Sequence, residues 1–357
     1  MNTFGKLFTL TTFGESHGPA IGGVIDGMPA RIAVSADFVQ AQLDRRRPGQ
    51  SHITTARKES DTVRILSGML DGLTTGAPIG FIIENADQHS RDYEEMRHTF
   101  RPSHADFTYQ AKYGIRDHRG GGRASARETA TRVVGGAFAR AALEAQGIQV
   151  LAWTSRVGDV AMNPMAKVTP ELVEANAVRC PDPEAAARMI RLIEEVKAQG
   201  DTVGGFIDCL ITGVPAGVGE PHFDRLNSRL GEAMLTIPAV KGVEFGMGFE
   251  GCCHRGSEMI DTFINKEGRI TTLSNNSGGI QGGISNGQPI RLRVAFKPVA
   301  TLLKPVDTVT DTGEETVLQA RGRHDPCVLP RAVPVVEAMA AMTVLDMILE
   351  ANARKLC

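Results

Sequence analysis

The chain lacks the charge and the aromatic content that mark nucleic-acid-binding proteins. Its 357 residues include 39 Lys and Arg against 41 Asp and Glu, for a formal net charge of −2, so no global basic field is present to attract a polyanion. Aromatic residues make up 5% of the chain, and Trp153 is the single tryptophan, which leaves few rings on which bases could stack. We therefore expect no nucleic-acid partner.

Cysteine pairs, targeting signals and long apolar runs are also scarce. The six cysteines include no C-x-x-C pair, a pattern typical of reduced thiols in a cytosolic protein of this length. The N-terminus lacks the charged segment and apolar core of a signal peptide, and we expect no apolar run to reach transmembrane length. These absences predict a soluble cytoplasmic protein without a membrane partner.

The nine histidines do not follow the spacing of a metal site. There is no H-E-x-x-H motif, and no two histidines stand one helical turn apart. Zinc sites are commonly built from such close pairs, often together with paired cysteines. No metal is expected.

What the sequence does contain is a glycine-rich turn crowded by arginine. Gly120, Gly121 and Gly122 precede Ser125 and Glu128, whose spacing predicts a capping box at the start of a helix. A helix start offers free N–H groups to an anion, but the turn lacks the Lys-Ser/Thr pair of a P-loop and the last glycine of a dinucleotide fingerprint. Four arginines favour a site for a multiply charged anion over a plain capped helix; they are Arg116, Arg119, Arg123 and Arg127.

Two histidines occupy unusual positions. His17 lies in a Gly-Glu-Ser-His-Gly turn between two expected strands, and His104 follows Arg101 within a long, irregular stretch over residues 85–122. Long irregular stretches in compact proteins are usually functional, and imidazole can hold or move a proton near neutral pH. Taken alone, either histidine is more often an ordinary satisfied residue than a catalytic one.

Two further basic segments leave alternatives open. Arg45-Arg46-Arg47 ends an expected helix capped by Ser35, where cations also suit the helix dipole without any ligand. Asp325 lies among the cations of residues 321–324. It either neutralises them or acts as a base that they hold ionised.

Periodicity and a weak repeat predict a layered α+β protein. A helix is expected over about 126–146, and the last helix, from about Pro334 to Ala353, is apolar nearly all round and so belongs inside the protein. Gly22–Asp26 and Gly204–Asp208 are similar strands that each lead through Pro-Ala to a helix, which indicates a weak internal two-fold repeat. We predict a sandwich of antiparallel β-sheets with helices packed between them, in one domain over residues 1–357.

Motifs spread over nearly the whole chain resemble those of the chorismate synthase family. In family order they are GESHG at 14–18, DRRRPG at 44–49, RPSHAD at 101–106, DHRGGGRASARETA at 117–130, GVGEP at 217–221, VKGVE at 240–244, GGIQGGIS at 278–285, RHDPC at 323–327 and RAVP at 331–334. So many long motifs in order do not arise by coincidence.

The resemblance implies a carbon–oxygen lyase of aromatic amino acid biosynthesis. In that family 5-enolpyruvylshikimate 3-phosphate loses phosphate and a ring proton in a 1,4-elimination to give chorismate, and reduced FMN is required although there is no net redox change. The family fold is a sandwich of antiparallel sheets enclosing helices with approximate two-fold symmetry, usually in a homotetramer. The substrate's two carboxylates and phosphate, with the flavin phosphate, account for the arginines, because guanidinium groups bind oxyanions in bidentate fashion.

The resemblance also implies roles for individual residues. His17 matches the histidine expected as imidazolium to help phosphate leave, His104 the one placed to protonate or stabilise the reduced flavin, and Asp325 the aspartate that assists proton removal. Implied substrate-binding residues are Ser16, Arg45, Arg46, Arg101, Arg127 and Arg323. Implied flavin-contacting residues are Arg123, Ala124, Ser125, Pro238, Ala239, Gly282, Lys297, Pro298, Val299, Ala300, Thr301 and again Arg323.

Some positions depart from the family pattern. Val299 and Ala300 stand where relatives often carry hydroxyl side chains, so two flavin contacts are expected to be missing, and Pro238 replaces a polar residue of some relatives. Arg46 and His52 are candidate NADP contacts, but many relatives have arginine at the position of His52. NADPH enters only as a source of reducing equivalents, and an external flavin reductase is expected because no extra domain is evident.

A rival hypothesis belongs to a different functional class. The chain could be a non-catalytic protein that binds flavin or a phosphorylated metabolite on the same fold. The presence of His17, His104 and Asp325 speaks against it, because a pure binding protein has no need of them.

Overall fold

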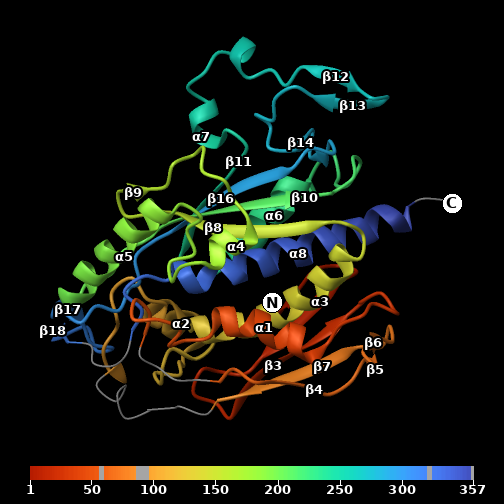
Figure 1. Cartoon of the computed structure of the whole chain (residues 1–357). Coiled ribbons are helices and arrows are strands. Elements are labelled where there is room, and N and C mark those ends of the chain that lie inside the picture. The colour runs from red at the N-terminus through yellow and green to blue at the C-terminus, as the bar shows by residue number, and fades with distance from the viewer. Residues whose placement is uncertain (56–59, 86–95, 320–323, 355–357) are drawn as a thin grey trace.

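Two antiparallel five-stranded sheets enclose a layer of helices (Figure 1). The computed structural model describes residues 1–55, 60–85, 96–319 and 324–354. The fold is therefore the predicted α+β sandwich of antiparallel sheets with helices packed between them.

Each sheet has a simple strand order. The first sheet runs β1 (Thr3–Phe4), β2 (Thr9–Phe13), β3 (Ala20–Asp26), β7 (Ile79–Glu84), β4 (Val63–Ile65). The second runs β11 (Val240–Phe245), β16 (Ile290–Phe296), β10 (Gly205–Thr212), β8 (Gln149–Val157), β9 (Val160–Ala161).

The helices are α1 (Ala36–Arg46), α2 (Asp106–Tyr113), α3 (Thr129–Glu144), α4 (Pro170–Glu174), α5 (Pro183–Ala198), α6 (Leu226–Leu235), α7 (Gly248–Gly251) and α8 (Leu329–Ala353). Small two-stranded sheets pair β5 (Met69–Leu70) with β6 (Leu73–Thr74), β12 (Phe263–Lys266) with β13 (Arg269–Thr272), β14 (Ile280–Gln281) with β15 (Ile284–Ser285), and β17 (Val306–Val309) with β18 (Glu315–Leu318).

Local sequence accounts for these elements. In β16 the buried Ile290, Leu292 and Val294 alternate with outward-facing arginines, the period-two pattern of a strand with one face on the core. Ser35 caps α1, since its Oγ accepts a hydrogen bond from the N–H of Phe38 at 3.0 Å. The predicted hairpin of β2 and β3 is confirmed, and its connecting turn carries His17.

The predicted repeat extends over the whole chain. Strands β2, β3, β4 and β7 lie in the order β2-β3-β7-β4, and strands β8, β10, β11 and β16 lie in the matching order β8-β10-β16-β11. In both copies one helix follows the second strand and another follows the fourth, so α1 corresponds to α6 and α3 to α8. The slight sequence similarity of β3 and β10 is thus the trace of a two-fold repeat of six elements.

Helix α8 is the centre of the molecule. It contacts α3, α1 and α6 as well as strands β8 and β10, and it lies between the two sheets in Figure 1. Its most apolar 18-residue window has a mean hydropathy of 1.8, enough by length and composition to cross a membrane, but 94% of that window is buried inside the protein. The expectation that no apolar run reaches transmembrane length was therefore wrong, while the predicted burial of this helix is confirmed.

Three local predictions were wrong. Helix α8 starts at Leu329 and not near Pro334, because that proline is accommodated inside the helix. The stretch over residues 85–122, predicted to be irregular, contains α2. The capping box does not form. Ser125 Oγ accepts from the N–H of Arg127 at 3.3 Å in a short 3-10 turn, while Glu128 pairs with Arg132 at 2.8 Å instead of returning to Ser125.

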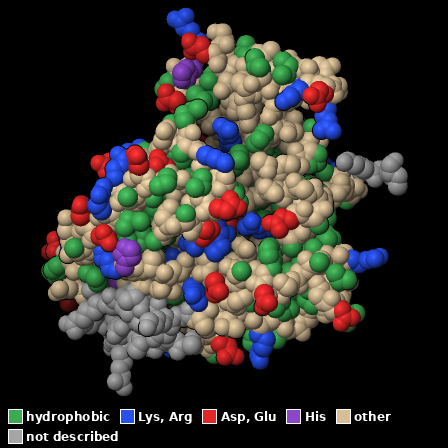
Figure 2. Space-filling model, in the orientation of Figure 1, with side chains coloured by type: hydrophobic (Ala, Val, Ile, Leu, Met, Phe, Trp, Pro, Cys, Tyr) green, Lys and Arg blue, Asp and Glu red, His purple; other side chains and the backbone are tan. Residues whose placement is uncertain are grey.

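On the face shown in Figure 2, acidic and basic side chains are intermixed. This agrees with the near-neutral total charge. Any strong positive field in this protein must therefore be local.

Candidate functional site

The glycine-rich turn packs against both candidate histidines. A Cβ atom built on Gly120 would lie 2.2 Å from the His17 ring, and one built on Gly121 would lie 3.1 Å from Cε1 of His104. Both glycines have positive φ angles, of 66° and 96°, a conformation that favours glycine. The turn therefore lies against two histidines that are 87 positions apart in the chain (104 − 17 = 87).

A cavity of about 380 Å³ opens beside this turn, within the ~300–1,000 Å³ typical of small-molecule sites. We call it the central cavity. Its lining consists of Arg46, Pro48, Thr55, Arg101, Ser103, His104, Ala105, Gly120, Ala124, Ser125, Ala126, Arg127, Pro238, Ala239, Lys297, Val299, Ala300, Thr301, His324, Asp325, Val328 and Arg331. Thirteen residues predicted for the site are in this set: Arg46, Arg101, His104, Ala124, Ser125, Arg127, Pro238, Ala239, Lys297, Val299, Ala300, Thr301 and Asp325.

Both halves of the repeat build the central cavity. Its lining segments follow the equivalent helices α1 and α6, follow the equivalent strands β7 and β16, and precede or begin the equivalent helices α3 and α8. The first half supplies Arg46, Arg101, Arg127 and His104, and the second supplies Arg331, Lys297 and five apolar side chains. We call the part of the lining around Arg46 and Arg127 the cationic wall, and the part formed by Pro238, Ala239, Val299 and Ala300 the apolar wall.

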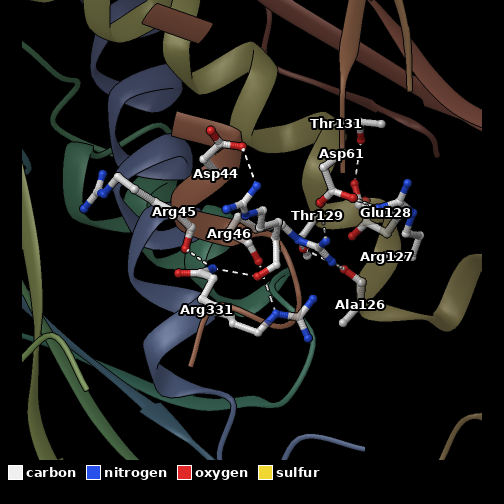
Figure 3. A network of polar contacts seen from close by, with 12 residues as sticks. Asp44, Arg45, Arg46, Asp61, Ala126, Arg127, Glu128, Thr129, Thr131 and Arg331 are labelled. Atoms are coloured by element: carbon white, nitrogen blue, oxygen red, sulfur yellow. Dashed lines mark hydrogen bonds and ion pairs between the residues drawn. The ribbon is translucent and has the colours of Figure 1, made fainter. Parts of the chain in front are cut away.

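Two buried arginines share one carboxylate at the cationic wall. Arg46 donates from Nη1 to Asp61 Oδ2 at 3.0 Å, and Arg127 donates from Nη1 to Asp61 Oδ1, as Figure 3 shows. The exposed fractions are 2% for Arg46, 4% for Arg127 and 1% for Asp61. Burial would raise the pKa of the Asp61 carboxyl, but the two guanidinium groups hold it below its usual value.

Further donors of these arginines are also held. Arg46 Nε donates to Thr129 Oγ1 at 3.1 Å and its Nη2 to the carbonyl of Ala126 at 2.6 Å. Arg127 Nε donates to Asn85 Oδ1 at 2.9 Å. Both guanidinium groups are therefore rigidly positioned before any ligand arrives.

Excess positive charge collects around Arg46. Burial, with the charges of Arg331 and Arg127, lowers the pKa of Arg46 to about 10 even though Asp61 acts in the opposite direction. A bound anion would relieve this repulsion. The cationic wall is thus suited to an anionic ligand.

Asp325 lies on the cavity between two partners. Its Oδ1 accepts from the backbone N–H of Thr55 at 2.9 Å, and its Oδ2 accepts from Arg331 Nη1. Arg331 Nε also donates to the carbonyl of Arg46 at 3.1 Å. Arg331 therefore connects the candidate base to the cationic wall through a charge-assisted hydrogen bond.

His104 belongs to a second buried cluster. Its Nδ1 lies 2.9 Å from Asp106 Oδ1, and Arg101 donates to the same carboxylate from Nε and from Nη2, both at 2.7 Å. Burial raises the pKa of Asp106, but the hydrogen bonds from Arg101 and His104 more than offset that effect and hold it well below the usual range. Asp106 is accordingly an anion at neutral pH.

The apolar wall contains the residues expected around the flavin. Pro238 and Ala239 follow α6, and Ala239 adopts a φ of 73°, an uncommon angle for a residue with a Cβ. Val299, Ala300 and Thr301 follow β16. Burial, with the neighbouring Lys241, lowers the pKa of the Lys297 ammonium at the rim.

Three predicted residues lie near but not on the cavity lining. His17 and Ser16 are buried behind Gly120, with Ser16 Oγ 3.2 Å from His17 Nδ1. Pro298 lies between two lining residues. Their predicted roles stay predictions.

Other predicted residues point elsewhere. Arg45 pairs with Glu337 and Glu174, carboxylates that outweigh its burial and raise its pKa. Arg123 donates to Thr12 Oγ1 at 2.7 Å on strand β2. Gly282 lies in the hairpin of β14 and β15, where a Cβ built on it would meet no atom within 4 Å.

Two predicted positions remain to be placed. His52 pairs with Glu194 at 3.0 Å, its side chain 63% exposed. It is not among the residues that line the central cavity with Arg46. Arg323 lies outside the described residues.

Asp61, Asp106 and Arg331 were not predicted as site residues. Asp106 and Arg331 lie within motifs that the resemblance identified, at RPSHAD and RAVP, so their neighbourhood was a usable signal. Asp61 lies in a polar segment without a motif, and only the fold brings it to the two arginines. Among the described residues, no group of three or more His, Cys, Asp or Glu could hold a metal ion.

Comparison with known proteins shows the family of this chain. The family model described as chorismate synthase matches residues 8–349. Chorismate synthase of Parabacteroides distasonis is 60% identical over 356 residues, 99% of each chain, and that of Phocaeicola vulgatus is 59% identical over 97% of each chain. A solved structure titled "Crystal Structure of Chorismate Synthase" matches with a TM-score of 0.75 and 31% identity, over 97% of this chain and 93% of that one.

Proposed function

Because the chain belongs to the chorismate synthase family, we propose that it converts 5-enolpyruvylshikimate 3-phosphate to chorismate. In this elimination the carbon–oxygen bond to phosphate breaks, one ring proton is lost and a second ring double bond forms. Atoms and electrons balance without an oxidant. The protein would accordingly be a lyase of aromatic amino acid biosynthesis.

The observation that carries the proposal is the set of arginines around one cavity. Arg46, Arg127, Arg101 and Arg331 line it, and the proposed substrate has two carboxylates and a phosphate. Burying three anionic groups together is very costly unless cations are already in place. Because Arg46 and Arg127 are positioned by fixed partners, little order would have to be gained on binding.

The residues of the apolar wall fit reduced FMN. Small side chains at Pro238, Ala239, Val299 and Ala300 leave room for a flat ring system, and Thr301 and Lys297 offer polar contacts at its edge. When bound, reduced FMN supplies the reducing power that the elimination requires. It is not consumed, because the reaction has no net redox change. The hydroxyl contacts expected to be missing at Val299 and Ala300 would be replaced by apolar contact.

Three residues would handle protons and the leaving group. His17, as imidazolium, would stabilise the departing phosphate; it lies against Gly120, which lines the cavity. Asp325, paired with Arg331, would accept the ring proton. His104, which lines the cavity, would hold a proton for the reduced flavin. General acid–base groups of this kind each contribute about 10²–10⁴-fold in rate.

We further propose one domain over residues 1–357, a homotetramer and an external source of reduced flavin. Arg46 is buried while His52 is paired at the surface, which does not support a shared NADP site. NADPH would therefore act through a separate reductase. An assay of the enzyme and its substrate with oxidised FMN and NADPH, but without a separate reductase, should yield no chorismate.

An anaerobic assay tests the main proposal. Enzyme with photoreduced FMN and the substrate should produce the absorbance of chorismate, and omission of flavin should abolish it. His17→Ala and His104→Ala should each lower kcat by at least about 10²-fold, whereas His254→Ala, on an exposed segment, should not. Flavin binding without product at any substrate concentration would instead indicate a binding protein.

A further inference from the structure

We infer that Asp106 is a positioning residue that holds His104 in a single tautomer, with Nδ1 protonated and Nε2 as the atom that exchanges a proton with the central cavity. The tautomer rests on geometry alone. Its use in turnover rests on the proposed function.

The chain is folded tightly to make this contact. Ser103 adopts a φ of 60°, and the N–H of His104 donates to the carbonyl of Arg101 at 3.2 Å. This turn places Arg101 and His104 on one carboxylate, that of Asp106 in the first turn of α2. Asp106 does not cap that helix, so its oxygens are available to the two side chains.

The carboxylate of Asp106 can only accept hydrogen bonds. It is 4% exposed and receives the backbone N–H of Arg101 at 3.0 Å in addition to two bonds from the Arg101 guanidinium. Arg116 Nη1 lies 3.7 Å from Oδ1. With two guanidinium groups beside it, Asp106 stays ionised, and an ionised carboxylate has no proton to donate. The His104 Nδ1 at 2.9 Å must therefore carry the hydrogen.

The other ring nitrogen lies beside the glycine-rich turn, in a residue that lines the central cavity. A Cβ built on Gly121 would lie 3.4 Å from His104 Nε2, and His104 lines the central cavity. When the ring is neutral, Nε2 accepts a proton, and when it is charged, Nε2 donates one. An orienting carboxylate of this kind fixes which nitrogen of a histidine does the proton transfer.

A simpler role would be that Asp106 only anchors Arg101. The substitution Asp106→Asn distinguishes anchoring of Arg101 from control of the His104 tautomer. The asparagine oxygen can still accept from Arg101, but the side chain can also donate to Nδ1, so the tautomer preference is lost while much of the anchoring remains. A role confined to Arg101 predicts an unchanged tautomer.

The first test is ¹⁵N NMR of the full-length, flavin-free wild-type protein at a pH where the His104 ring is neutral, with the signals assigned by His104→Gln. We expect a protonated Nδ1 and an unprotonated Nε2. A mixture of tautomers, or the reverse tautomer, overturns the inference. This measurement does not depend on whether any variant folds.

The second test compares two substitutions. Asp106→Asn should give a mixture of His104 tautomers and lower kcat by about 10²-fold. Asp311→Asn is the matched control, because Asp311 also lies 2.9 Å from a histidine Nδ1, that of His98, but the pair is exposed. Asp311→Asn should leave the His104 tautomer and kcat unchanged. An Asp106→Asn protein with the wild-type tautomer contradicts the inference, even if its KM rises.

The outcomes separate the two proposals. A single tautomer in a protein that forms no chorismate refutes the proposed function and leaves the tautomer assignment intact. Normal chorismate formation with mixed wild-type tautomers refutes only the role of Asp106.

Discussion

The positions of His17 and His104 depend on the absence of two Cβ atoms. Gly120 and Gly121 let the backbone pass directly beside the imidazole rings, which a larger residue would displace. Since rates fall steeply when a catalytic group shifts by about 1 Å, these glycines matter through geometry and not through chemistry of their own.

Gly120→Ala should therefore impair the site more than the fold. A Cβ 2.2 Å from the His17 ring forces that ring to move, so we expect a loss of kcat of about 10²-fold. The free energy of unfolding should fall by about 1–3 kcal/mol. Steady-state kinetics and urea denaturation measure the two effects.

Gly114→Ala is the control for backbone strain. Gly114 has a φ of 71° but no atom within 4 Å of the added Cβ. It should cost about 1 kcal/mol of stability and leave kcat unchanged. Equal kinetics for the two variants would show that Gly120 does not position His17.

Asp61 is the residue on which the cationic wall depends. Asp61→Asn leaves Arg46 and Arg127 buried without their shared counter-charge, and breaking a buried pair in this way costs about 3–5 kcal/mol. Asp44→Asn removes an exposed ion pair with Arg47 at 3.7 Å and should cost at most about 1 kcal/mol. Chemical denaturation of both variants gives the comparison, and similar losses would contradict the assigned role.

At the residue level, the sequence motifs predicted several residues that the fold brings to one cavity, although their roles stay predictions. His104, Asp325, Arg46 and Arg127 all came to one cavity although they lie far apart in the chain. Asp61 could not be predicted, because nothing local distinguishes a buried counter-ion from a solvated aspartate. Its role depends on a contact across 66 residues.

At the scale of elements, α3 and α8 are pressed together at a glycine. A Cβ on Gly136 would lie 2.2 Å from the Cβ of Ala338. Such close approach allows two helices to share the space between the sheets. Arg127, just before α3, and Arg331, in the first turn of α8, both lie on the cavity, so we expect the helix contact to influence the spacing of these two arginines.

Gly136→Ala should destabilise the protein although alanine is the better helix former. We expect a net loss of about 1–3 kcal/mol from overpacking, together with weaker substrate binding as the helix ends separate. Gly231→Ala in α6 meets no atom within 4 Å and should instead be stabilising by up to about 1 kcal/mol. Thermal and urea unfolding test both signs, and stabilisation by Gly136→Ala would refute the close contact.

Element boundaries were less predictable than element types. The start of α8 was misplaced because a proline usually marks a helix start, while here Pro334 lies inside the helix. The expected capping box failed because Arg132 offers Glu128 a charged partner. Both errors arise because contacts with other parts of the chain, or with neighbouring side chains, override the local sequence pattern.

For the whole molecule, the repeat and the sandwich were predictable in outline. A weak match between two strands indicated a duplication, and the strand orders confirm it. The position of the cavity was not predictable, since it depends on how the two copies meet. Figure 1 shows their helices sharing one layer.

Stability of the whole molecule should fall in acid because of its buried carboxylates. The pKa values of Asp61 and Asp106 are lowered in the folded protein, so between the folded and unfolded pKa values the unfolded chain binds more protons. Their contribution is therefore complete above about pH 5 and is lost as pH falls below about 4 toward the folded-state values. Asp61→Asn and Asp106→Asn should each reduce the acid slope of the unfolding free energy by up to about 1.4 kcal/mol per pH unit.

Urea titrations from pH 3 to pH 7 measure this slope. Asp44→Asn, at an exposed position, should follow the wild type. Parallel curves for all variants would show that the buried carboxylates do not govern acid unfolding.

A site built from both halves of a duplicated fold has an evolutionary consequence. Two identical copies of a half-length ancestor would have enclosed a cavity with two equal walls, since a two-fold interface repeats every group. In a single chain the two halves can differ, and here Arg46, Arg101 and Arg127 come from the first half while Pro238, Ala239, Val299 and Ala300 come from the second. A single chain can therefore offer two different surfaces within one cavity, whereas a dimer of identical halves would offer the same surface twice.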